Sequence, residues 1–287
     1  MNHSLPRRAF VALQYLVPQH LLSRLFGYLA GSRIPVLKDF LIRRFIAAFA
    51  VDMREALDPD PSSYADFNAF FTRALAPGAR PLDSAPDSLV SPADGAISQL
   101  GRIEAGRIVQ AKGHWFSSAE LLDDPQLARR FDEGSFATIY LSPRDYHRVH
   151  MPLAGRLVAM HYIPGCLFSV NQSTAEHVPR LFARNERLVC QFETAHGPLA
   201  MVLVGAMIVA GIETVWSGPI TPAGQHTLAI DLEMPASERS LEKGAEMGRF
   251  QLGSTVILLL PRGVASWDPA LGEGSTVHMG ARIATLG

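Results

Sequence analysis

Leu252-Gly253-Ser254-Thr255 leads directly into Val256-Ile257-Leu258-Leu259-Leu260 near the end of this 287-residue chain. A continuous apolar run of this length, entered through a glycine-containing turn, is typical of a strand buried in a sheet. Similar short runs, separated by Gly, Pro and Asp, begin at about Val90, so residues 90–287 are predicted to form a β-rich domain. The predicted strands are Ala96–Leu100, Phe136–Leu141, Gly155–Tyr162, Leu188–Phe192, Leu199–Val204, Met207–Ile212 and Thr255–Leu260.

One helix is predicted within this domain, over residues 117–131. Ser117 and Ser118 serve as its cap, and Glu120 lies near its start. The chain has two cysteines, Cys166 and Cys190, which are too few for a disulfide framework and match no metal-ligand spacing. Buried, reduced thiols are therefore the favoured interpretation.

The first 50 residues differ from the rest in charge. They contain seven basic residues and one acidic residue, so their net charge is +6, whereas the remaining 19 basic and 26 acidic residues give −7. Apolar residues in this segment recur at helical spacing after Pro18 and again after Pro35, which predicts two amphipathic helices with basic polar faces. Such helices are typical of a membrane surface, and the alternative is that they pack on the body of the protein or on a second subunit.

Two other interpretations of the N-terminal segment are weaker. A signal peptide would require a small-residue cleavage site, but Pro18-Gln19-His20 follows the apolar run Ala9–Val17. A spanning helix needs about 20 apolar residues, and Pro18, Arg24, Arg33 and Lys38 interrupt the candidate windows. The predicted organisation is α+β: membrane-associating helices over 1–51, a helical bridge over 52–89, and a mainly antiparallel β-rich catalytic domain over 90–287.

Three segments contain residues with chemical potential. The Gly253-Ser254-Thr255 turn has a duplicate at Gly274-Ser275-Thr276, so this tripeptide alone does not identify a reactive serine. His147 and His150 lie three residues apart, and because no third ligand accompanies them at a characteristic spacing, a metal site is not favoured. Asp94, in an Asp-Gly turn before a strand, completes the set of acid, imidazole and hydroxyl that activates a nucleophile.

Taken together, several blocks of the sequence resemble bacterial phosphatidylserine decarboxylase proenzymes. Leu-Gly-Ser-Thr at 252–255 is similar to the processing motif of this branch of the family, and Tyr-His-Arg-Val-His at 146–150 is similar to a second characteristic block. The other similar blocks are Ser91–Gly101, Gln110–His114, Tyr140–Pro152, Phe182–Arg187, Gly211–Trp216 and Glu246–Thr255.

The resemblance implies two consecutive reactions at one serine. In the first, His150, oriented by Asp94, deprotonates Ser254, which attacks the carbonyl of Gly253; the resulting ester then eliminates. This autocatalytic cleavage makes a large subunit, 1–253, and a small subunit, 254–287, that begins with a pyruvoyl group. In the second reaction the pyruvoyl cofactor forms a Schiff base with phosphatidylserine, and phosphatidylethanolamine and CO₂ are released. His147 is the residue assigned to substrate contact and to delivery of the proton that the former α-carbon receives.

The resemblance also implies a zymogen and lyase of phospholipid biosynthesis that uses no metal and binds no nucleic acid. Its expected location is the cytoplasmic face of the cell membrane, where the enzyme is peripheral and contacts an anionic surface, and a dimer of heterodimers is the implied assembly. The alternative function is that of a serine hydrolase using Asp94, His150 and Ser254 without self-cleavage. No Gly-x-Ser-x-Gly elbow surrounds Ser254, however.

Overall fold

The computed structural model describes residues 11–15, 17–111, 113–206, 211–220, 227–251 and 254–287. Within them, nine strands form one large antiparallel sheet, in the order β12-β7-β8-β9-β15-β5-β2-β17 with β13 beside β7. Strand β15 lies between β9 and β5 and contains the apolar run that predicted it. The strands of this sheet are β2 (Gly95–Arg102), β5 (Ser135–Leu141), β7 (Gly155–Ile163), β8 (Arg187–Thr194), β9 (Gly197–Val204), β12 (Leu228–Ile230), β13 (Ser240–Leu241), β15 (Ser254–Leu260) and β17 (Thr276–Val277).

Smaller sheets cover one face of the large sheet. The hydrophobic cluster between them contains alternate residues of β15, such as Val256 and Leu258, together with Met247 and Ile212 of the four-stranded sheet. The smaller sheets have the orders β11-β10-β14-β6 and β1-β18-β16, and β3 and β4 form a hairpin. The strands of these two sheets are β1 (Ser88–Val90), β6 (Arg148–His150), β10 (Ile212–Thr214), β11 (Gly218–Ile220), β14 (Glu246–Phe250), β16 (Ala265–Trp267) and β18 (Arg282–Leu286), and those of the hairpin are β3 (Arg107–Ala111) and β4 (His114–Ser117).

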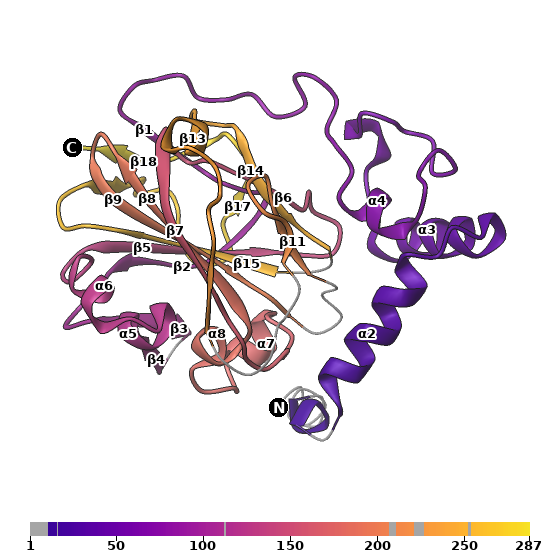
Figure 1. The fold of residues 1–287 in the computed structure, drawn as a ribbon, viewed down its shortest axis with the longest axis horizontal. Coiled ribbons are helices and arrows are strands. Elements are labelled where there is room, and N and C mark those ends of the chain that lie inside the picture. Colours follow the sequence, from indigo (N-terminus) through magenta and orange to yellow (C-terminus); the bar gives the residue numbers. More distant parts are fainter. Residues whose placement is uncertain (1–10, 16, 112, 207–210, 221–226, 252–253) are drawn as a thin grey trace.

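Short helices and the β3–β4 hairpin cover the opposite face of the large sheet (Figure 1). Here Ile257 and Leu259, the other alternate residues of β15, pack in a second cluster. Strand β15 is therefore buried on both faces, which explains why its sequence is apolar at every position from Val256 to Leu260. The covering helices are α5 (Ser118–Leu122), α6 (Pro125–Arg129), α7 (Gln172–Ala175) and α8 (Leu181–Arg184), and a 3₁₀ turn, η2 (Ala236–Arg239), follows β12.

The N-terminal helices lie to one side of the β-rich body (Figure 1). Both predicted helices are confirmed, as α2 (Gln19–Ala30) and α3 (Pro35–Phe49). Helix α3 packs through Ile42 on a separate cluster that includes Phe70 and Phe71 of α4 (Phe67–Phe71). Lys38, assigned to a polar face by the sequence pattern, is instead buried and donates hydrogen bonds to Asp39 and to the Ser62 carbonyl. No helix within the described ranges is both long and apolar enough to cross a bilayer.

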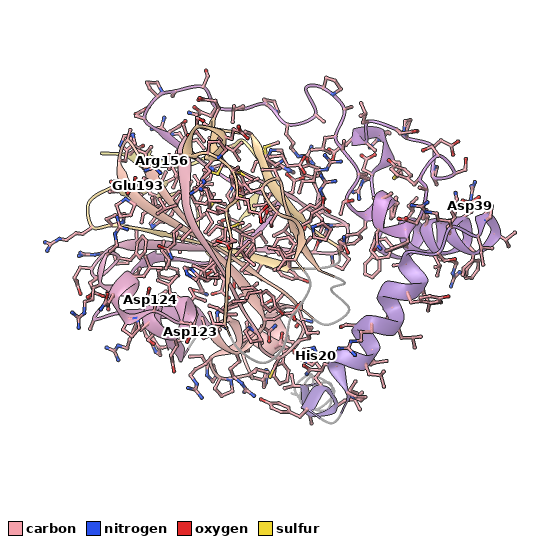
Figure 2. All side chains as sticks on the ribbon, viewed as in Figure 1. His20, Asp39, Asp123, Asp124, Arg156 and Glu193 are labelled. Atoms are coloured by element: carbon pink, nitrogen blue, oxygen red, sulfur yellow. The ribbon has the colours of Figure 1, made fainter. Side chains whose placement is uncertain are left out.

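Four expectations need correction or restriction. The single helix over 117–131 is wrong: the chain forms α5 and α6, because Asp123 adopts a left-handed conformation (φ 53°) and Asp124 caps a new helix that begins at Pro125 (Figure 2). The helices of the bridge over 52–89 are only η1 (Met53–Glu55) and α4, the rest is largely irregular, and its last two residues already belong to β1. Most of the predicted strand 207–212 lies outside the described residues. Both cysteines are free, but Cys166 is only half-buried.

Candidate active site

Ser254 is the first residue of β15 and is completely buried. Its backbone pairs with Leu141 of β5, and its hydroxyl has no hydrogen-bond partner among the described residues. A buried hydroxyl without a partner costs about 1–3 kcal/mol, so it calls for a structural or chemical reason. The Thr255 hydroxyl is in the same situation, and the orphaned group alone therefore does not single out Ser254.

His147 precedes the short strand β6 and is also completely buried. Its Nδ1 lies 2.8 Å from the Asp145 carbonyl oxygen, and since a carbonyl only accepts, Nδ1 carries the proton. Nε2 is then an acceptor, and it has no partner among the described residues. Burial lowers the pKa of His147 to about 3, so the ring is neutral at physiological pH. The ring packs on Phe71 with centroids 4.0 Å apart.

His150, at the end of β6, has both ring nitrogens engaged. Nδ1 donates to the Gly244 carbonyl at 2.8 Å, and Nε2 accepts from the Tyr146 hydroxyl at 3.0 Å. This arrangement fixes the tautomer in which Nε2 is the basic nitrogen. Burial lowers the pKa of His150, and the charge of Asp94 opposes that shift to a smaller extent.

Asp94 precedes β2 and is almost fully buried. Its carboxylate accepts hydrogen bonds from Nε of Arg80 at 3.0 and 2.9 Å, from Nη2 of Arg80 at 2.6 Å, and from the Met279 N–H at 2.8 Å. No hydrogen bond joins Asp94 to His150 in the described part of the chain. The backbone nevertheless holds the two segments together, because the His150 N–H donates to the Pro92 carbonyl at 2.8 Å.

The sheet register sets the distance between Asp94 and Ser254. Leu141 of β5 pairs with Ser254, and continuing the β2–β5 register by one residue places Gly95 on the other side of Leu141. With strands about 4.8 Å apart, Gly95 and Ser254 are separated by roughly 10 Å. At this separation an effect of Asp94 on Ser254 would need an intervening group such as an imidazole.

Sequence reasoning missed several residues that contact this site. Arg80 and Tyr146 bind the carboxylate and one imidazole directly, and Phe71 packs on the other imidazole. Arg80 and Phe71 lie in the bridge, and their sequence context does not indicate a functional role. An arginine between Gly78 and Pro81 resembles an exposed turn residue, and Phe71 resembles a residue of the hydrophobic core. Arg148 also contacts the bridge, donating to the Thr72 carbonyl at 2.8 Å and pairing with Glu246 at 2.7 Å.

Metal ligands do not gather in the part of the chain that the structure describes: no group of three or more His, Cys, Asp or Glu side chains could hold an ion there. The site instead combines a buried hydroxyl with two buried imidazoles. Because burial depresses both pKa values and hydrogen bonds fix both tautomers, each ring is neutral near pH 7 and has an unprotonated Nε2.

The burial of His147 predicts a specific pH dependence of stability. The folded ring resists protonation down to about pH 3, whereas the unfolded ring takes up a proton near its ordinary pKa of about 6.5. The unfolded state therefore binds more protons in this window, and the free energy of unfolding falls as the pH is lowered. From about pH 7.5 to about pH 5.5, His147 should account for a loss of ~1.4 kcal/mol.

This loss should disappear in a His147→Gln variant. Chemical denaturation of both proteins in an unprocessed Ser254→Ala background measures it on a single chain. An identical pH dependence of the unfolding free energy with and without His147 would contradict the assigned burial.

Comparison with known proteins places this site in a family. Residues 67–285 match the profile of the phosphatidylserine decarboxylase family, and residues 9–50 match a second profile, described as PSD. A phosphatidylserine decarboxylase proenzyme of Pseudomonas putida is 59% identical over 280 residues, covering 96% of this chain and 97% of the relative. Proenzymes of the same name from Stutzerimonas stutzeri and Pseudomonas aeruginosa are 59% identical over 279 and 280 residues, covering 96% of this chain and 94% and 96% of the respective relative. The chain belongs to the phosphatidylserine decarboxylase family.

Proposed function

We propose that this chain is a self-processing, pyruvoyl-dependent phosphatidylserine decarboxylase that forms phosphatidylethanolamine and CO₂. Its relatives are named phosphatidylserine decarboxylase proenzymes, a name that fits a precursor which matures. The observation that carries the proposal is the position of Ser254: a buried serine that follows a glycine in sequence begins the central strand β15. It pairs with Leu141, the end of β5, from which the chain continues to His147 and His150.

The first proposed reaction is attack of the Ser254 hydroxyl on the carbonyl of Gly253. Glycine has no Cβ to hinder the approach. His150 takes the hydroxyl proton on Nε2, which requires the Tyr146 hydroxyl to release that nitrogen. Asp94 stabilises the resulting imidazolium by its charge, in keeping with its effect on the pKa of His150. The ester then eliminates, which releases the chain ending at Gly253 and leaves dehydroalanine at position 254. Water hydrolyses the dehydroalanine to the pyruvoyl group with loss of ammonia, and the two chains are residues 1–253 and 254–287.

The residues around Ser254 fit the pyruvoyl group that would replace it. The position is fully buried beside Val256 and Leu141 in the cluster between the sheets, so water is largely excluded from a reactive carbonyl. When formed, the group supplies an electron sink for the C–C bond that breaks during decarboxylation. Nε2 of His147 is the free acceptor that we assign to a hydrogen bond from the substrate amine.

The N-terminal helices are proposed to hold the enzyme on an anionic membrane surface. Their large apolar side chains are exposed, Tyr28 and Val36 at 82% and Leu21 at 65%, and are therefore not packed on the body of this chain. Arg24, Arg43 and Arg44 are exposed on the same helices, and Arg33 is exposed in the turn between them. Each basic residue near an anionic surface is worth about 1 kcal/mol, and apolar burial adds to it.

Charge placed in this apolar surface should weaken membrane binding. We expect Leu25→Glu and Phe40→Glu, at positions 54% and 59% exposed, each to reduce binding to phosphatidylserine-containing vesicles about tenfold or more. Self-cleavage and turnover of a short-chain, dispersed substrate should be unchanged. Vesicle co-sedimentation measures the binding, and Leu57→Glu, 62% exposed but outside α2 and α3, is the matched control.

Equal vesicle binding by the variants and the wild type would argue against the proposed membrane surface. Deletion of residues 1–50 is a less suitable test. It removes Ile42 and Ala30 from the cluster that contains Phe71, and Phe71 packs directly on His147.

The proposed function is tested on the purified wild-type protein. We expect two chains by intact mass, with a ketone-bearing N-terminus at position 254, and release of CO₂ from phosphatidylserine. A serine hydrolase would remain one chain of 31.3 kDa and would release no CO₂. A single uncleaved chain with no decarboxylase activity would refute the proposal.

A further inference from the structure

A second buried carboxyl group lies in the same row of the large sheet as Ser254. Continuing the register of β8, β9 and β15 by one residue sets Gly205 between Ser254 and Glu186. The Gly205 N–H donates to the Glu186 carbonyl oxygen at 2.9 Å, which confirms this pairing. Glu186 is therefore two strands from Ser254, on the side opposite Asp94.

The side chains of Glu186 and Ser254 point to the same face of the sheet. Residues two positions along a strand share a face, and the residues at that spacing are Leu188, Leu203 and Val256. All three belong to the buried cluster between the sheets. Glu186 therefore enters the space that contains Ser254, rather than the opposite face covered by the short helices.

Gly205 leaves the space between these two side chains open, and Glu186 occupies it. A Cβ added to Gly205 would lie 3.0 Å from Cγ and 3.1 Å from Oε1 of Glu186. Cβ atoms of paired residues on adjacent strands are about 5 Å apart. The carboxyl group thus extends over Gly205 and ends roughly one strand spacing from the side chain of Ser254.

The surroundings of Glu186 favour its protonated form. It is 4% exposed, and it forms no ion pair within the described residues. The Tyr162 hydroxyl of β7 donates to Oε2 at 2.9 Å, and His20 of α2 is the nearby ionisable group from the N-terminal helices (Figure 2). Burial raises the pKa of Glu186, while the Tyr162 hydrogen bond and His20 oppose the shift.

Decarboxylation requires an acid, and the histidine beside the site is unsuited to that role. One proton must replace the departing CO₂ on the substrate carbon. Nδ1–H of His147 is held by the Asp145 carbonyl, and Nε2 carries no proton in that tautomer. His147 can accept a proton but has none to give on the nitrogen that is free.

We propose that Glu186 is the catalytic acid of the second reaction, delivering the proton that replaces CO₂ on the substrate's α-carbon. This inference rests on the proposed function. As the C–CO₂ bond breaks, its electron pair stays with the substrate, and that pair forms the new C–H bond with the proton from Glu186. The electrons of the broken O–H bond remain on the Glu186 oxygen, which becomes a carboxylate. The Glu186 carboxylate regains its proton from solvent water at the end of each turnover.

Glu186→Gln tests the proposal, because glutamine keeps the shape and can still accept the Tyr162 hydrogen bond but cannot deliver the proton. Self-cleavage should proceed as in the wild type, while kcat for decarboxylation falls about 100-fold or more. Glu186→Asp should recover part of the rate. Glu193→Gln is the matched control on the same strand β8, where Glu193 is exposed and paired with Arg156 (Figure 2), and it should behave as the wild type.

Two further measurements distinguish proton delivery from a structural role. In D₂O the wild type should place one deuterium stereospecifically on the carbon that loses CO₂, and Glu186→Gln should place it on both faces. Infrared spectra of the unprocessed Ser254→Ala protein should contain the carbonyl band of a protonated carboxyl group at neutral pH, and the added Glu186→Gln change should remove it.

Several results would overturn the inference. One is a kcat of Glu186→Gln within about threefold of the wild-type value, because loss of a catalytic acid predicts a far larger decrease. Unchanged deuterium stereochemistry in Glu186→Gln and absence of the carboxyl band at neutral pH are two more. The fourth is failure of Glu186→Gln to self-cleave, which would assign the residue to maturation instead. Failure of the proposed function is seen separately, because the wild type itself would then neither cleave nor decarboxylate.

Discussion

Ser254→Ala is expected to remain a single chain of 31.3 kDa with no decarboxylase activity. Without the hydroxyl there is no nucleophile to attack the carbonyl of Gly253 and no precursor of the pyruvoyl group. The loss should therefore be complete rather than partial. Intact mass spectrometry after prolonged incubation makes the measurement, and denaturing gels give an independent one.

The duplicate tripeptide provides the control. Ser275→Ala should be processed as the wild type is, because the Ser275 hydroxyl has a structural role: it accepts the Gly272 N–H at 3.0 Å in the turn before β17. Ser254, in contrast, is buried with its hydroxyl unpartnered among the described residues. A Ser254→Ala protein that still divides at residue 254 would falsify the central claim.

Arg80→Met is expected to have the largest effect among residues that the sequence did not reveal. It leaves the Asp94 carboxylate almost fully buried without its cation, a change that typically costs about 3–5 kcal/mol. Self-cleavage should be lost as well, because a carboxylate without this partner no longer keeps its position near His150. Chemical denaturation in the Ser254→Ala background measures stability, and cleavage is followed with Ser254 present.

Two companion variants separate charge from packing in this experiment. Arg54→Met should change stability little, since Arg54 is 91% exposed in its pair with Asp52. Arg80→Met combined with Asp94→Asn should recover most of the lost stability, because the only partner of Arg80 that stays charged, Glu55, is partly exposed to solvent, yet it should still fail to cleave. Near-wild-type stability of Arg80→Met alone would show that Asp94 does not depend on this cation.

The sequence was informative where a local pattern determines the structure. Apolar runs located β15 and five other strands, and prolines with helical periodicity located α2 and α3. The helix over 117–131 was mispredicted because the left-handed turn at Asp123 interrupts a pattern that is otherwise helical. The spacing of apolar residues does not reveal a single residue whose φ and ψ lie outside the helical region.

The candidate site was predictable only in part, and the reason is again physical. Ser254, His147, His150 and Asp94 stand in recognisable motifs. Their partners do not: Arg80 and Glu186 reach the site by side-chain direction and sheet register, which depend on pairings between distant segments. A hydrogen bond between Asp94 and His150 is also absent from the described contacts, since Arg80 binds the Asp94 carboxylate and the Gly244 carbonyl accepts from Nδ1 of His150.

The central position of β15 has a consequence for the lifetime of the molecule. Seven residues of β15 pair with β5 and five pair with β9, so the strand that would begin the small subunit is held along its length by the large one. After cleavage, refolding from the unfolded state would require two separate chains to meet, whereas the precursor folded as one. Unfolding of the two-chain enzyme would then be effectively irreversible, because the separated chains refold inefficiently. The time for which the enzyme stays active would be set by its rate of unfolding rather than by a folding equilibrium.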